Sequence, residues 1–138
     1  MSLVQARAIV PLAISAALLA ACASGGGMYD QPYALFEPEA RRPAADTRAA
    51  FVLKIDGVDQ TINRADPVAP GMRQVVVSIP GAPGMSESVH ATMSIDAKPC
   101  MRYYLAARRP SATSRDWSPF IAATEPIGEC QKKFAGKY

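Results

Sequence analysis

Apolar and polar residues alternate along much of the chain after residue 48, and a period of two is typical of half-buried β-strands. The alternation covers four stretches, 51–55, 72–79, 88–95 and 101–107. One side of each stretch is therefore expected to face a core, as in antiparallel sheets with one solvated face. The residues expected inside are Phe51, Leu53, Ile55, Val75, Val77, Ile79, Val89, Ala91, Met93, Ile95, Met101, Tyr103, Leu105 and Ala107.

Turn signals separate these stretches. Asp56-Gly57 between two apolar runs predicts a tight hairpin, because both residues tolerate positive φ. Proline and glycine interrupt the chain again on each side of 72–79, and a last strand is expected near 117–123. We expect an all-β fold over 48–138, a small antiparallel β-sandwich of about six to seven strands, with room for a short helical turn near its end.

The N-terminal segment has a different pattern, an unbroken apolar run from Ala8 to Ala21 that follows Arg7. A membrane-spanning helix needs about 20 apolar residues, so this shorter run is instead typical of a signal peptide. Its last residues together with the next one read Leu-Ala-Ala-Cys, 19–22, and this sequence resembles the lipobox of bacterial lipoproteins.

The lipobox resemblance implies a lipid anchor. Residues 1–21 would be removed as the signal peptide, and the thiol of Cys22 would carry a diacylglyceryl group. Two or three acyl chains hold a protein stably on a membrane, whereas one chain is marginal. Ala23 follows the cysteine where an aspartate usually signals retention at the inner membrane, so the resemblance implies a periplasm-facing protein of the outer membrane. The alternative is an ordinary signal peptide with a cysteine nearby by chance.

Residues 22–47 are expected to form a flexible tether. They begin with a glycine-rich run and continue with proline, alanine and charged residues that follow no period. Four large apolar residues, Tyr29, Tyr33, Leu35 and Phe36, are unusual in a spacer. The alternative is that they pack on the domain as an edge strand or contact a partner.

The chain has three cysteines. With Cys22 lipidated, Cys100 and Cys130 remain as a pair in an oxidising compartment, and we expect them to form a disulfide. Closing a loop of this length is worth about 3–4 kcal/mol in the chain-entropy model. The alternative is two separate buried thiols.

Two weaker resemblances concern the domain itself. The sequences KIDGVDQTI and VAPGMRQVVVSI, within 52–79, resemble the PEGA-type β-domain of bacterial envelope proteins. Met72-Arg73-Gln74 departs from that family, which often has a histidine soon after the Pro-Gly turn. The stretches KPCMRYYLAA and EPIGEC are similar to those of small envelope lipoproteins without an assigned role. Both resemblances imply a binding or structural module and bring no catalytic residue.

The residues themselves suggest no catalytic, cofactor or metal site. The net charge of +3 is too small to argue for nucleic acid. His90 is the one histidine, has no ligand-spaced partner, and is expected on the surface. No Gly-x-Ser-x-Gly elbow is present. Asp56, Asp59 and Asp66 cluster near the hairpin, where solvated carboxylates are preferred to a calcium site because no regular binding loop surrounds them.

One strand face is a candidate for recognition. Arg102, Tyr104 and Arg108 should point outward from one strand, with Arg109 and Arg115 in the following loop. Arginine and tyrosine are enriched where surfaces bind partners, and arginine binds the anionic groups of envelope polymers or lipids. The alternative is a solvated strand face.

The expected function is that of a non-enzymatic envelope lipoprotein that binds or supports an envelope protein or glycan. An assembly subunit of a multi-protein envelope or secretion complex is the alternative. An envelope hydrolase is the third and least supported reading.

Overall fold

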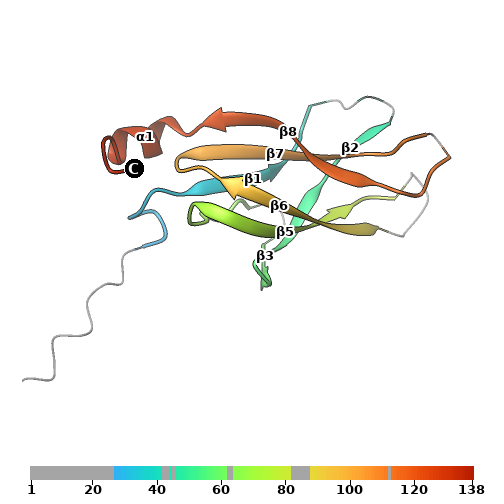
Figure 1. Ribbon diagram of the computed structural model, residues 1–138, viewed down its shortest axis with the longest axis horizontal. Helices are drawn as coiled ribbons and strands as arrows, with labels where there is room; N and C mark the ends of the chain where they lie inside the picture. Colours follow the sequence, from blue (N-terminus) through green and yellow to red (C-terminus); the bar gives the residue numbers. More distant parts are fainter. Residues whose placement is uncertain (1–26, 42–43, 45, 62–63, 82–87, 112) are drawn as a thin grey trace, which may run out of the picture.

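Two β-sheets lie face to face, and a short helix, α1 (Gly128–Lys133), packs at one end of them (Figure 1). The computed structural model describes residues 27–41, 44, 46–61, 64–81, 88–111 and 113–138. Sheet A contains β1 (Ala34–Pro38), β2 (Thr47–Ala49), β7 (Met101–Arg108) and β8 (Ser118–Pro126). Sheet B has the order β4 (Val58–Asp59), β3 (Phe51–Ile55), β5 (Gly71–Ile79) and β6 (Val89–Ala97). The expected all-β sandwich is confirmed, with eight strands in the described residues.

Strand β7 is the centre of sheet A. On one side it pairs antiparallel with β8, and on the other side it pairs with β1 and then β2. β1 runs parallel to the first half of β7, whereas β2 runs antiparallel to its second half. The two short strands therefore share a single edge of β7.

The chain changes sheets at Ala50. β2 belongs to sheet A and β3 to sheet B, and Ala50 is the one residue between them. Its side chain is fully buried, and its N–H donates to the carbonyl of Leu105 at 3.1 Å. β2 and β3 thus form one extended segment that joins the two layers.

The predicted inner faces supply most of the core between the sheets. Val75, Val77, Ile79 and Leu105 are all 0% exposed. The prediction is wrong at Val89, which is 38% exposed because it begins β6, the edge strand of sheet B. It is also wrong at Phe51 and Leu53, because Val52 packs against the core in their place, next to a register shift between Val52 and Lys54. The predicted hairpin joins β3 to β4 and is confirmed.

The expected tether is partly wrong. Residues 33–36 are buried, and β1 lies in sheet A, so the edge-strand alternative is confirmed for this segment. The strand is covered on both sides: Ala34 and Phe36 join the core between the sheets, whereas Tyr33 and Leu35 pack against the α1 end. The sandwich therefore includes residues well before residue 48. The signal peptide and Cys22 lie outside the described residues.

A second, smaller core lies under α1. It joins residues from the start of β1, the start of β7 and the helix, namely Tyr33, Leu35, Cys100, Ile127, Cys130 and Phe134. No helix in the described part of the chain is long and apolar enough to span a membrane.

Candidate functional site

Arg102 and Tyr104 lie together on the outer face of sheet A, as predicted from the alternation of β7. The Tyr104 hydroxyl donates to Oε2 of Glu125 on β8 at 2.8 Å. Nε of Arg102 lies 3.2 Å from Oε1 of Glu37 on β1 and forms an ion pair without a hydrogen bond at that nitrogen. Three neighbouring strands thus supply one network, which consists of two carboxylates, one guanidinium and one phenol.

Arg102 is a cation that lies between carboxylates from two neighbouring strands. A hydrogen bond with Tyr104, followed by the negative charges of Glu37 and Glu125, raises the pKa of Arg102. Because two carboxylates lie beside this cation, the face carries charges of both signs. Such a surface suits hydrogen-bonded recognition of a polar partner better than it suits a polyanion.

Arg108 does not belong to this network. It is six residues from Arg102 along β7, which is roughly 20 Å in a strand. Between Tyr104 and Arg108 lies Ala106, which is fully buried. Arg108 instead lies over the ring of Phe120, 4.9 Å from its centroid, and 3.9 Å from a carboxylate oxygen of Asp46. The structure therefore divides the predicted three-residue face into two places.

A cluster around Trp117, at the opposite end from α1, was not predicted from the sequence. The guanidinium groups of Arg48 and Arg109 lie 5.1 and 5.2 Å from the centroid of its ring. Arg48 also donates to the carbonyls of Pro80, at 2.9 Å, and Gly81. Both arginines stabilise the packing of Trp117 through cation–π contact. Arg115, the other loop arginine of the sequence analysis, is exposed.

A cleft of about 400 Å³ opens at the edge of the sandwich, between β1 and β3. This volume is within the range of small-ligand sites, which combine an apolar lining with a few polar groups. Its apolar lining includes Phe36, Phe51, Val52 and Ile55, and its polar lining includes Glu37, Gln60, Thr61, Arg64 and Asp66. Glu37 belongs both to this cleft and to the ion pair with Arg102, so the two surfaces are adjacent.

The three aspartates near the hairpin are engaged separately. The carboxylate–cation distances are 2.8 Å for Asp56 with Arg73, 3.0 Å for Asp59 with Lys54 and 2.9 Å for Asp66 with Arg64. Hydrogen bonds from Arg73 and from the backbone N–H of Gln74 hold the pKa of Asp56 below its usual value. Within the ranges the structure describes, no three histidine, cysteine, aspartate or glutamate side chains gather as metal ligands would. His90 is exposed on β6.

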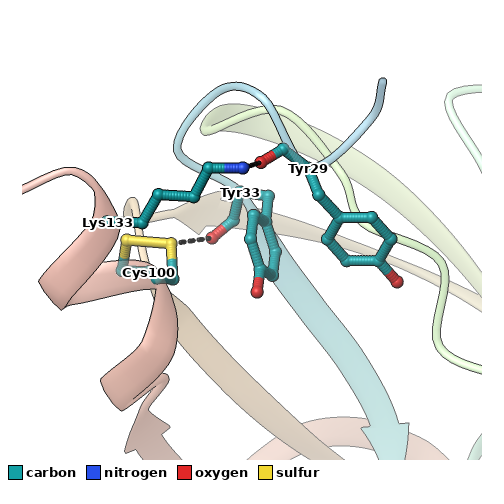
Figure 2. The surroundings of a disulfide bond; sticks show 5 residues. Tyr29, Tyr33, Cys100 and Lys133 are labelled. Atoms are coloured by element: carbon teal, nitrogen blue, oxygen red, sulfur yellow. Dashed lines mark hydrogen bonds between the residues drawn. A yellow bond between two sulfur atoms is a disulfide. The ribbon is translucent and has the colours of Figure 1, made fainter. Parts of the chain in front are cut away.

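The predicted disulfide joins Cys100, just before β7, to Cys130 in α1. Hydrogen bonds tie three chain segments around it. The N–H of Cys100 donates to the carbonyl of Tyr33 at 2.7 Å, and the N–H of Ile127 donates to the carbonyl of Cys100 at 2.8 Å. Sγ of Cys130 lies 3.9 Å from the same Tyr33 carbonyl (Figure 2). The bridge therefore also holds the segment that leads into β1.

Lys133 of α1 binds the segment that leads into β1. Nζ of Lys133 donates to the carbonyl of Tyr29 at 2.7 Å and lies 3.3 Å from a carboxylate oxygen of Asp30 (Figure 2 shows the lysine and Tyr29). The rings of Tyr29 and Tyr33 meet edge to face, 5.0 Å between centroids. Burial, and then the charge of Glu129, raise the pKa of Tyr33.

The described residues thus define a small disulfide-closed β-sandwich with three distinct surfaces: the Arg102–Tyr104 network, the edge cleft and the α1 end. No protein-family model, curated protein or solved structure matches the chain.

Proposed function

We propose that the protein is a non-enzymatic lipoprotein of the bacterial outer membrane, anchored through Cys22 and facing the periplasm. The use of the cysteines supports this proposal. Cys100 and Cys130 are bonded to each other, so neither is a partner for Cys22, whose thiol remains available for lipid attachment. A disulfide is also typical of compartments outside the cytoplasm.

Mass spectrometry of the purified full-length protein tests the anchor. The expected N-terminal peptide begins at Cys22 and carries diacylglyceryl and acyl mass. The Cys22→Ser variant is the matched control, and it should keep the Cys100–Cys130 bridge but lose the lipid. An unmodified Cys22 in the wild-type protein refutes the anchor.

We further propose that the edge cleft holds the envelope component that this protein binds or supports. The cleft combines apolar residues from both sheets with polar groups along its rim, which is the composition of a binding site. The adjacent Arg102–Tyr104 network offers fixed hydrogen-bonding groups beside it. A segment of an envelope protein or a glycan fits this combination.

Photo-crosslinking in intact envelopes tests this role. A photoreactive amino acid at Gln60 samples the cleft, one at Tyr104 samples the outer face of sheet A, and one at the exposed His90 is the control. Crosslinks from position 60 that are absent from position 90 support the cleft. Crosslinks from position 104 alone would place the binding site on the outer face of sheet A instead of the cleft. The absence of crosslinks from both positions 60 and 104 would refute the binding role. One stoichiometric protein product favours the assembly subunit over a glycan-binding module.

A further inference from the structure

The α1 end holds the chain close to the proposed lipid anchor. Two hydrogen bonds join Gly27 to Asp30. The N–H of Gly27 donates to the carboxylate of Asp30 at 2.6 Å, and the N–H of Asp30 donates to the carbonyl of Gly27 at 2.8 Å. Asp30 in turn is paired with Lys133 of α1. The chain is therefore attached to the sandwich from residue 27, whereas the start of the domain was predicted at residue 48.

This attachment shortens the tether. Only five peptide steps separate Cys22 from Gly27, and a fully extended chain spans at most about 3.6 Å for each residue. Gly27, which is attached to the α1 end, consequently lies within roughly 18 Å of the Cα atom of Cys22. A domain tied this closely to the bilayer must turn one particular end toward it.

That end also carries exposed apolar side chains. Met28 is 64% exposed, Tyr29 48% and Met72, at the start of β5, 65%. Tyr138, which follows α1, is 59% exposed. These are four of the seven large apolar residues that are exposed in the described parts of the chain, the others being Val58, Val89 and Ile121.

The chemistry of the α1 end suits a lipid surface. Tyrosine is enriched at the level of lipid head groups, where its ring is buried and its hydroxyl is solvated. Lys132 in α1 and Lys137, next to Tyr138 in the sequence, are exposed as well, and a lysine near a membrane directs its charge to the head groups. Glu129 offsets part of this charge. Tyrosine and methionine therefore contribute more to the contact than net charge does.

We propose that the α1 end is a second membrane contact, which lies against the head groups of the bilayer that holds the lipid. This inference rests on the proposed anchor at Cys22. It orients the sandwich, because β7 runs away from the α1 end for eight residues, roughly 25 Å, toward the β7–β8 loop (Figure 1). Trp117 is then far from the bilayer, whereas the Arg102–Tyr104 network, which lies on the first half of β7, is at the end of the sandwich nearer to it.

Fluorescence quenching in vesicles tests this orientation. The full-length lipidated protein is reconstituted into phosphatidylcholine–phosphatidylglycerol vesicles that contain a head-group spin-labelled lipid. Trp117 is the only tryptophan of the chain, so the wild-type protein reports on the far end. The Tyr29→Trp variant in a Trp117→Phe background reports on the α1 end. Val89→Trp in the same background is the matched control at the far end.

We expect the tryptophan at position 29 to be quenched several-fold more strongly than the tryptophans at 117 and 89. Equal quenching at the three positions, or stronger quenching at 89, overturns the orientation. Peptide mapping of the Cys100–Cys130 bridge verifies the fold of each variant, and the wild-type measurement needs no substitution. Mass spectrometry of the same samples separates the two proposals. Missing acyl mass at Cys22 refutes the anchor and the orientation with it, whereas lipidated protein with equal quenching refutes the orientation alone.

Discussion

Removing the disulfide is expected to destabilise the sandwich by about 4 kcal/mol. The perturbation is the double variant Cys100→Ala/Cys130→Ala, which leaves no thiol at either position. The two cysteines are separated by 30 residues, and the chain-entropy model gives about 3.7 kcal/mol for a closed loop of this length at 25 °C. Both cysteines are also at most 1% exposed, so the lost sulfur contacts add to the cost.

Urea unfolding followed by Trp117 fluorescence measures this loss. Trp117 lies at the end of the sandwich away from the bridge, so its signal reports the whole domain and not the local change. A reductant supplies the matched control: it should shift the unfolding midpoint of the wild-type protein but leave that of the double variant unchanged. A loss below about 1 kcal/mol would contradict the reasoning, because other contacts would then restrain the 30-residue loop without the covalent bond.

The remaining predictions concern a strained residue, a surface ion pair and the core. Cys100 has φ 57°, a conformation that costs an L residue about 1–2 kcal/mol, so Cys100→Gly/Cys130→Ala should unfold at higher urea than the double alanine variant; the reverse order contradicts the strain. Arg73 lowers the pKa of Asp56, so this carboxylate stabilises the fold above its unfolded pKa of about 3.9 and the gain is lost as the pH falls through the lower folded pKa. The difference in urea midpoint between wild type and Asp56→Asn should therefore shrink below about pH 4, and a constant difference refutes the linkage. Leu105→Ala should cost about 3 kcal/mol in urea unfolding, since Leu105 is fully buried between the sheets, and a cost under about 1 kcal/mol would contradict its core position.

The strands with one solvated face could be predicted because their pattern is local. In β5, Val75, Val77 and Ile79 are apolar at every second position, and the structure buries all three. β1 was not predicted as a strand because it is covered on both faces. Its residues Ala34, Leu35 and Phe36 are consecutive apolar residues and therefore show no period of two. A continuous apolar run is the pattern of a doubly covered strand, and Tyr33, Leu35 and Phe36, noted in the expected tether, were its signal.

The candidate sites were harder to predict because they depend on register between distant strands. The outward direction of Arg102 and Tyr104 follows from the alternation of β7. Their carboxylate partners do not, because Glu37 comes from a parallel strand and Glu125 from an antiparallel one. The Trp117 cluster likewise brings Arg48, which is far away in the sequence, to Arg109 and Trp117, and no local pattern indicates it.

The change of sheets at Ala50 has a consequence for how the domain unfolds. β2 and β3 are consecutive parts of one extended segment, so β2 cannot leave sheet A without pulling on β3 in sheet B. The N–H of Ala50 donates to the carbonyl of Leu105, which is a fully buried residue of β7. The junction between β2 and β3 is therefore also bonded to the core of sheet A. The two layers are thereby coupled into one cooperative unit, and the slowest-exchanging amides of both sheets should share a single free energy of opening.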